Sequence, residues 1–292
     1  MPARLTVHFH DRAALPRLFG DDARVRIGRD GDSELRLDHP SVSRAHAELC
    51  GEHGRWRLRD LGSKNGTRVD DRAVVETELA ADGWLRFGDV YCEFELLDDA
   101  RAAAGERRER ERRTRATALT AGLQQATGFG DLLEGSLRAV IELAHCGRGF
   151  LLLREGDGDY AVRAQHALEA QRDVGRFSGS VGAVDRALRE RRAVVANDIG
   201  RDRWLSARAS VVAGGLSALV CLPLLEDGEA LGAIYADRVG AGEAVSVLDL
   251  ELLEAFAERA ALYIAARRAS DALGARAWPR WRRIAGAGAE LR

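Results

Sequence analysis

Arg29-(13 residues)-Ser43-Arg44-Ala45-His46-(18 residues)-Asn65-Gly66-Thr67 is the stretch that decides the fold of the first part of the chain. Short runs of alternating apolar residues flank its three polar segments, so we expect three loops gathered at one rim of a β-sandwich. An arginine, a hydroxyl, a lysine and an amide at one rim suit the binding of an oxyanion better than the breaking of a bond.

Strand-like stretches and turn signals alternate throughout residues 4–97, with no helical period. Gly- and Asp-rich turns separate the stretches, as in an antiparallel sandwich. We therefore predict an all-β sandwich domain over residues 4–97. The strand-like stretches are residues 5–9, 25–27, 34–37, 45–49, 56–61, 67–69, 84–87 and 91–97.

At 292 residues the chain is long enough for two domains of ordinary size. Hydrophobic residues make up 46% of the 292 residues, and a formal net charge of −2 does not indicate nucleic-acid binding. No apolar run approaches the ~20 residues that span a bilayer, and residues 1–5 lack the apolar core of a signal peptide, so we expect a cytoplasmic protein. The four cysteines (Cys50, Cys92, Cys146 and Cys221) are scattered, so we expect reduced thiols rather than disulfides or a zinc site. We also expect no cofactor and no other metal.

The loop motifs resemble the forkhead-associated (FHA) domain. The family pattern is present, in order and with matching spacing, as Gly28-Arg29, Ser43-Arg44-x-His46, Ser63-x-Asn65-Gly66-Thr67 and Leu85-x-x-Gly88-Asp89. The resemblance covers residues 4–97. It implies a sandwich of about eleven strands that binds phosphothreonine peptides through its apical loops.

The chemistry of the loop residues suits such a ligand. A phosphothreonine brings close to two negative charges and three acceptor oxygens. Arg29 offers a planar fork of donors, Ser43 a hydroxyl, and Lys64 a point charge at a position where the family often has Thr or Ser. Asn65 has both a donor and an acceptor with which to grip a peptide backbone, and we expect Arg44 to support the peptide contacts.

Three further residues are expected to support the site. Gly28 and Gly66 allow a close approach and a turn of the backbone. His46 lies in the strand after the second loop, where we expect it to hydrogen-bond the loops into place. The chain departs from the family at Asp70-Asp71, where a second Asn-Gly pair is common, and we expect this to alter which residue is preferred after the phosphothreonine.

Residues 98–117 are predicted to form a charged helical linker. Arginines and glutamates alternate between residues 106 and 115 at spacings that suit an exposed helix. A helix that transmits motion between domains and a basic patch for nucleic acid are alternatives. The absence of stacking aromatics disfavours the second.

Residues 118–268 are predicted to form an α+β domain with a central antiparallel sheet, because helical spacing at both ends encloses strand-like hairpins. The segment resembles a GAF domain. The residues that carry the resemblance are 149–153, 177–181, 210–211, 216–224 and 231–237, followed by the final helix.

GAF domains bind cyclic nucleotides, tetrapyrroles, other small molecules or only protein partners. The chain does not match the Asn-Lys-x-Asp-Glu set of cyclic-nucleotide binders, and neither Cys146 nor Cys221 is placed for bilin attachment. Phe177, Trp204 and Tyr235 are candidates for a ligand pocket, with a role in the core as the alternative. The first and last helices of such domains often pair, so we expect a homodimer.

Two other sequence features do not change this interpretation. Gly156-x-Gly158-x-x-Ala161 matches a relaxed dinucleotide fingerprint, but we expect it to lead into a strand rather than a helix and therefore reject it. Residues 269–292 are rich in Arg, Ala and Gly and are expected to form a flexible basic tail, with a nucleic-acid-binding arm as the alternative.

Together these patterns predict a bacterial signalling adaptor without enzymatic activity. Its first domain would dock a phosphothreonine protein, such as the substrate of a serine/threonine kinase, and its second would sense a small molecule or dimerise. The alternative is a transcriptional regulator without the ATPase module of many relatives, with the basic tail contacting DNA. We expect neither membrane binding nor nucleic-acid binding in the preferred interpretation.

Overall fold

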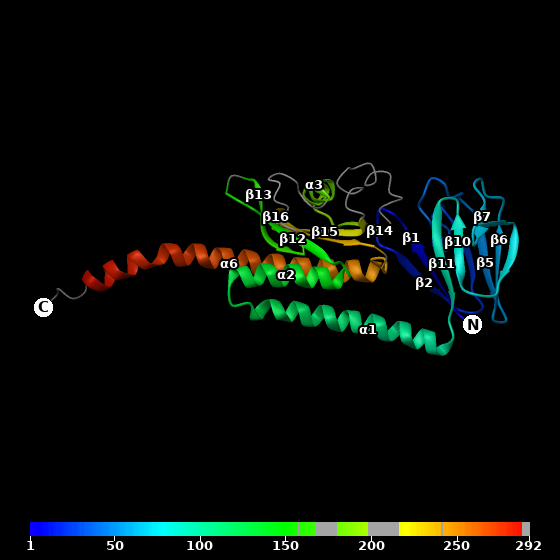
Figure 1. Cartoon of the computed structure of the whole chain (residues 1–292), viewed down its shortest axis with the longest axis horizontal. Helices are drawn as coiled ribbons and strands as arrows, with labels where there is room; N and C mark the ends of the chain where they lie inside the picture. Colours follow the sequence, from blue (N-terminus) through cyan, green and yellow to red (C-terminus); the bar gives the residue numbers. More distant parts are fainter. Residues whose placement is uncertain (157, 168–179, 198–215, 241, 288–292) are drawn as a thin grey trace. The chain divides into compact units, whose positions relative to one another are not determined.

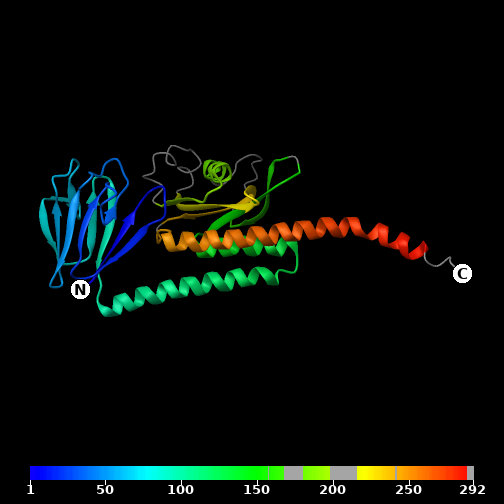
Figure 2. The same cartoon turned by 180° about the vertical axis from the view of Figure 1, so that it is seen from behind.

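The computed structural model describes residues 1–156, 158–167, 180–197, 216–240 and 242–287. The chain forms a β-rich first domain and an α+β second domain (Figures 1 and 2). None of the described helices is long and apolar enough to cross a membrane.

The first domain is a sandwich of two sheets, as predicted. Residues 1–97 are all described and contain eleven strands, β1 to β11. One sheet has the order β2-β1-β11-β10-β7-β8 and the other β4-β3-β5-β6-β9. The strands are β1 (Ala3–His8), β2 (Leu15–Phe19), β3 (Arg24–Gly28), β4 (Leu35–Arg36), β5 (Ala47–Glu52), β6 (Arg55–Asp60), β7 (Thr67–Val69), β8 (Arg72–Val74), β9 (Glu76–Leu79), β10 (Gly83–Phe87) and β11 (Val90–Leu96).

Alternation of buried and less buried residues along the strands builds the sandwich core. In β1 every second residue is fully buried, and β11 pairs with it in antiparallel register from Ala3↔Leu96 to His8↔Tyr91. Trp56 lies in the same core and donates its indole N–H to the backbone oxygen of Met1 at 2.9 Å. This rigid core holds the loops between its strands at fixed positions.

Helix α1 (Asp99–Gly122) follows the sandwich and contains the predicted linker. Its start is held by Arg101, which donates to the backbone oxygen of Leu96 and to Asp82, both at 2.8 Å. The helix continues beyond residue 117, where we expected the linker to end. Residues 118–121 are Ala, Leu, Thr and Ala, none of which stops a helix, and the helix ends at Gly122.

The second domain is built on a five-stranded sheet with the order β13-β12-β16-β15-β14. Helix α2 (Phe129–Leu143) covers one face of this sheet, and helix α3 (Val181–Glu190) lies on the other (Figures 1 and 2). This is the predicted α+β architecture. The strands are β12 (Arg148–Arg154), β13 (Tyr160–His166), β14 (Val194–Asn197), β15 (Leu216–Glu226) and β16 (Glu229–Val239), and the short helix η1 (Leu123–Gln125) precedes α2.

Two helices of the second domain start with a serine cap. The Ser180 hydroxyl accepts a hydrogen bond from the Ala183 N–H at 3.2 Å at the start of α3. Ser246 and Asp249 form a reciprocal capping box at the start of α6 (Val247–Ala287).

The end of the chain differs from the expectation of a flexible tail. Residues 269–287 continue helix α6, since Ala and Arg are strong helix formers. Residues 288–292 lie outside the described part of the chain.

Candidate functional site

Three loops of the sandwich meet through backbone and side-chain hydrogen bonds. Arg29 follows β3, Ser43 lies in the connection between β4 and β5, and Asn65 lies between β6 and β7. The backbone N–H of Arg29 donates to the Ser43 carbonyl at 2.9 Å, and the Arg29 Nε donates to the Val42 carbonyl at 3.3 Å. The first and second loops are therefore joined directly at the predicted site.

The second loop is joined to the third in the same way. The Ser43 hydroxyl accepts from the Lys64 N–H at 3.0 Å, and the Asn65 carboxamide donates to the Ser41 carbonyl at 2.7 Å. The structure therefore gathers Arg29, Ser43, Lys64 and Asn65 around one short segment of backbone.

The buried side chain of His46 connects the second loop to the third. It is fully buried, its Nδ1 accepts from the Ser43 N–H at 3.0 Å, and its Nε2 lies 3.2 Å from the Gly66 carbonyl. A backbone N–H can only donate and a carbonyl can only accept, so the proton sits on Nε2. Burial lowers the pKa of His46, with the Gly66 carbonyl and the charge of Asp60 opposing the shift. The lowered pKa favours the neutral ring, which holds the second and third loops together through its two hydrogen bonds.

Gly28 lies at a close approach of two backbone segments and Gly66 in a turn, as predicted. A Cβ on Gly28 would lie 2.0 Å from the Arg44 carbonyl oxygen, a separation that no side chain tolerates. Gly66 has φ +77°, in the left-handed region that favours glycine. The Arg44 side chain is exposed, and the Arg44 carbonyl accepts from the Asp30 N–H at 3.2 Å.

Asp60 supports the third loop, although sequence analysis did not single it out. Its carboxylate accepts from the Gly62 and Ser63 N–H groups and from the Ser63 and Thr67 hydroxyls, at 2.6 to 2.9 Å. Burial acts to raise the pKa of Asp60, but the hydrogen bonds from Ser63, Thr67 and Gly62 outweigh it, so the pKa is lowered. The signal in the sequence is an Asp two residues before Gly62, as in an Asx-turn.

Of the three residues proposed to line a pocket in the second domain, only Tyr235 can be placed. Phe177 and Trp204 lie outside the described residues. Tyr235 is fully buried, its ring stacks on Phe150 with centroids 4.8 Å apart, and its hydroxyl accepts from the Ser180 N–H at 3.2 Å. Burial, reinforced by the charge of Asp237, raises the pKa of Tyr235. Tyr235 is thus a core residue that also holds the start of α3.

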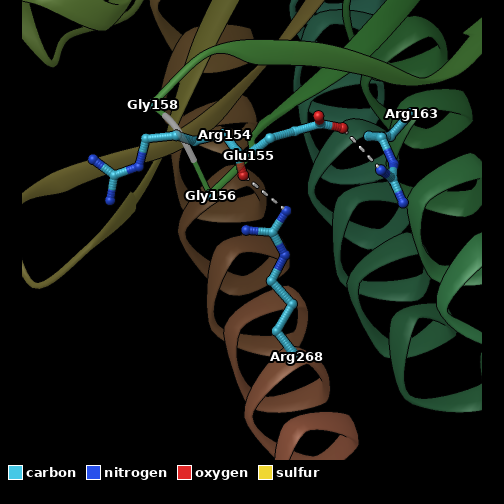
Figure 3. A pocket seen from close by; sticks show the side chains of 6 residues that line it. All are labelled: Arg154, Glu155, Gly156, Gly158, Arg163 and Arg268. Carbon is cyan, nitrogen blue, oxygen red and sulfur yellow. Dashed lines mark hydrogen bonds and ion pairs between the residues drawn. The ribbon is translucent and has the colours of Figure 1, made fainter.

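A separate open pocket of about 860 Å³ lies at the turn between β12 and β13 (Figure 3). Arg163 pairs with Glu155 at 3.2 Å, and Arg268 donates to the Arg154 carbonyl at 3.3 Å. Figure 3 shows the three guanidinium groups pointing in different directions rather than at one ligand position. The turn leads into strand β13, as predicted, so among the described residues a strand rather than a helix follows the glycines of the rejected dinucleotide fingerprint.

Comparison with protein families identifies both domains. Residues 25–88 match the model of the FHA domain, and residues 129–264 match the model of the GAF domain. The chain therefore contains an FHA domain followed by a GAF domain.

Curated relatives match the FHA portion. The glycogen accumulation regulator GarA of Mycolicibacterium smegmatis is 40% identical over 67 residues, which are 23% of this chain and 42% of GarA. The chain spans less than half the length of the curated relatives it matches.

Solved structures match each domain. The FHA domain of FhaA, a Mycobacterium tuberculosis protein, was solved in complex with the intracellular domain of Rv3910. It is 28% identical, with 32% of this chain and 99% of that chain covered at a TM-score of 0.28. A GAF domain from a phosphoenolpyruvate-protein phosphotransferase of Coxiella burnetii is 16% identical, with 56% of this chain and 99% of that chain covered at a TM-score of 0.46.

Proposed function

We propose that the FHA domain binds a phosphothreonine-bearing segment of a partner protein. The observation that carries this proposal is the segment 41–44, which hydrogen-bonds both to the Arg29 loop and to the Lys64-Asn65 loop. It places a guanidinium, a hydroxyl, an ammonium and a carboxamide on loops that are tied to one another.

Each side chain has a role in this proposal. The Arg29 guanidinium and the Lys64 ammonium neutralise the phosphate, which carries close to two negative charges. The Ser43 hydroxyl donates to a phosphate oxygen, and Asn65 bonds to the peptide backbone beside the phosphothreonine. Arg44 is exposed and available to the flanking peptide residues.

A phosphopeptide library tests the proposal. The full chain is used to capture peptides from matched phosphorylated and unphosphorylated sets, together with Arg29→Ala and Ser43→Ala. We expect capture of phosphothreonine peptides by the wild type and its loss in both variants. Arg17→Ala, which removes an exposed arginine on β2, is the matched control and should bind as the wild type does. Equal capture of the unphosphorylated set by the wild type refutes the proposal.

The GAF domain is assigned a supporting role. We propose that it binds a small molecule, pairs two copies of the chain, or does both, in a cytoplasmic signalling adaptor that reads the products of a serine/threonine kinase. The match of residues 129–264 to the GAF model supports this part. Light scattering on the full chain gives the mass in solution, and a monomer at all concentrations contradicts the homodimer.

The adaptor is preferred over the two other classes. The transcriptional regulator with a DNA-contacting tail draws no support from either matched domain. An enzyme is disfavoured because the side chains gathered at the loops, a guanidinium, a hydroxyl, an ammonium and a carboxamide, suit the binding of an oxyanion better than the breaking of a bond. Salt-dependent binding of duplex DNA by the full chain would favour the regulator.

A further inference from the structure

The Asn65 carboxamide is already oriented before any peptide binds. It donates to the Ser41 carbonyl at 2.7 Å, and since a carbonyl can only accept, the amide nitrogen must face Ser41. The carboxamide oxygen and the second N–H remain available to a peptide backbone. Any contact that fixes the Ser41 carbonyl therefore also fixes the Asn65 carboxamide, which is proposed to bind the peptide main chain.

Two hydrogen bonds join Ser41 to the imidazole of His39. The Ser41 N–H donates to His39 Nδ1 at 3.2 Å, and the Ser41 hydroxyl lies 2.7 Å from the same nitrogen. Because a backbone N–H can only donate, His39 Nδ1 carries no proton, and the Ser41 hydroxyl must donate to it. The same hydroxyl oxygen accepts from the Asp89 N–H at 2.8 Å. His39 Nδ1 is therefore the acceptor for both polar hydrogens of Ser41.

The turn after β10 closes the other side of Ser41. Gly88 has φ +61°, and a Cβ there would lie 2.5 Å from the Ser41 carbonyl oxygen. The Gly88 N–H donates to the Gly66 carbonyl at 3.2 Å, next to Asn65 in the chain. The backbone at Gly88 therefore packs closely against the Ser41 carbonyl. The imidazole of His39 holds the N–H and the hydroxyl of the same residue.

We propose that His39 is a positioning residue for peptide recognition, which acts through Ser41 on the carboxamide of Asn65. This inference rests on the proposed function of the site. In it, His39 does not touch the phosphate; it keeps the Ser41 carbonyl in place so that Asn65 meets the peptide backbone without reorganising. A carboxamide held in its binding orientation loses less conformational freedom when the peptide arrives.

A double-mutant cycle separates this role from a general structural one. Binding of one phosphothreonine peptide from the library is measured by calorimetry for the full-length wild type, His39→Ala, Asn65→Ala and the double variant. We expect His39→Ala to weaken binding about three- to tenfold, the effect of one neutral hydrogen bond. The double variant should bind no more weakly than Asn65→Ala, because His39 has nothing to position once the carboxamide is gone.

Two single variants complete the design. His39→Asn places a carboxamide oxygen where Nδ1 was, so it should restore binding to near the wild-type value. His53→Asn changes a histidine whose side chain is 91% exposed in the turn between β5 and β6, and should bind as the wild type does. Equal weakening by His39→Asn and His39→Ala overturns the proposal.

A second measurement does not depend on peptide binding. The side-chain amide of Asn65 gives its own pair of NMR signals, and exchange of its protons with water reports the hydrogen bond to Ser41. We expect slow exchange in the wild type and in His39→Asn, and faster exchange in His39→Ala. Unchanged exchange in a folded His39→Ala refutes the link from His39 to Asn65.

The two proposals fail in different ways. A wild type that binds no phosphothreonine peptide refutes the proposed function, while the exchange measurement still decides the His39–Ser41–Asn65 link. The second case is a wild type that binds the peptide and a double variant that binds more weakly than Asn65→Ala by the whole factor measured for His39→Ala. This result leaves the proposed function intact and overturns the positioning role of His39.

Discussion

The Ser43 hydroxyl accepts the backbone N–H of Lys64 at 3.0 Å, so the group proposed to bind a phosphate also holds the loop that carries Asn65. This oxygen has two lone pairs and one proton. It can accept from Lys64 and donate to a phosphate oxygen at the same time. The two tasks do not compete.

Ser43→Ala should therefore weaken phosphopeptide binding at least about tenfold, because a hydrogen bond to a charged group contributes about 1.5–3 kcal/mol. The variant also leaves the Lys64 N–H without its acceptor. Ser43→Thr keeps a hydroxyl and should retain most of the affinity. Calorimetry gives the affinities and thermal unfolding checks the fold. Wild-type affinity in a folded Ser43→Ala would exclude this hydroxyl from the site.

Gly28→Ala tests the close approach of the first and second loops. The added Cβ would lie 2.0 Å from the Arg44 carbonyl, so the backbone must move, at a cost of about 1–3 kcal/mol of stability. We expect a lower melting temperature and weaker phosphopeptide binding, since Arg29 is the next residue. Gly31→Ala is the matched control, because nothing lies within 4 Å of its added Cβ. Equal melting temperatures for the two variants would contradict this account.

Much of the fold follows from the periodicity of the sequence. Alternating apolar residues such as Leu5 and Val7 indicated strands of the sandwich, and these two side chains are fully buried in its core. The lengths of the helices were harder to predict. The charge pattern that indicated the linker fades before Gly122, although the helix does not, because Ala and Leu continue a helix without any charge.

The candidate site was predictable only in part. Arg29, Ser43 and Asn65 carry side chains whose chemistry suits an oxyanion, so the sequence alone indicates them. Ser41 and His39 are different, because their importance comes from contacts between loops distant in the chain, such as the bond from Asn65 to Ser41 across 24 positions. Short polar residues make local bonds at many loop positions, and nothing in the sequence tells which of them a distant loop uses.

Acid should destabilise the first domain through His46. Its pKa is lowered in the folded state, so between the folded and unfolded pKa values the unfolded chain binds more protons. The stabilising contribution of neutral His46 is therefore complete above the unfolded value of about 6.5 and is lost as the pH falls through the folded pKa. Urea unfolding at a series of pH values, followed by hydrogen exchange of peptides from β5 and β7, measures this free energy.

His46→Phe provides the comparison for that series. Phenylalanine fills a similar volume but cannot titrate, and it leaves the Ser43 N–H and the Gly66 carbonyl without their partner. We expect a less stable domain, by about 1–3 kcal/mol for each unpaired group, whose stability changes less with pH in this window. A pH dependence identical to that of the wild type would show that His46 is not the group responsible.

Arg148→Ala should destabilise the GAF domain far more than loss of a surface pair does. Asp237 is fully buried, and its carboxylate lies 2.5 Å from Arg148 Nε, so the variant leaves a buried charge without its partner, at a cost of about 3–5 kcal/mol. Arg138→Ala is the control, since Arg138 and Glu134 are both mostly exposed and such pairs contribute about 0.5 kcal/mol or less. Hydrogen exchange of peptides from β12 and β16 reports the local free energy of unfolding.

Adding Asp237→Asn to Arg148→Ala should recover part of the loss, because an amide has no charge to bury. If the double variant were no more stable than Arg148→Ala alone, lost packing of the arginine stem rather than an uncompensated charge would explain the effect.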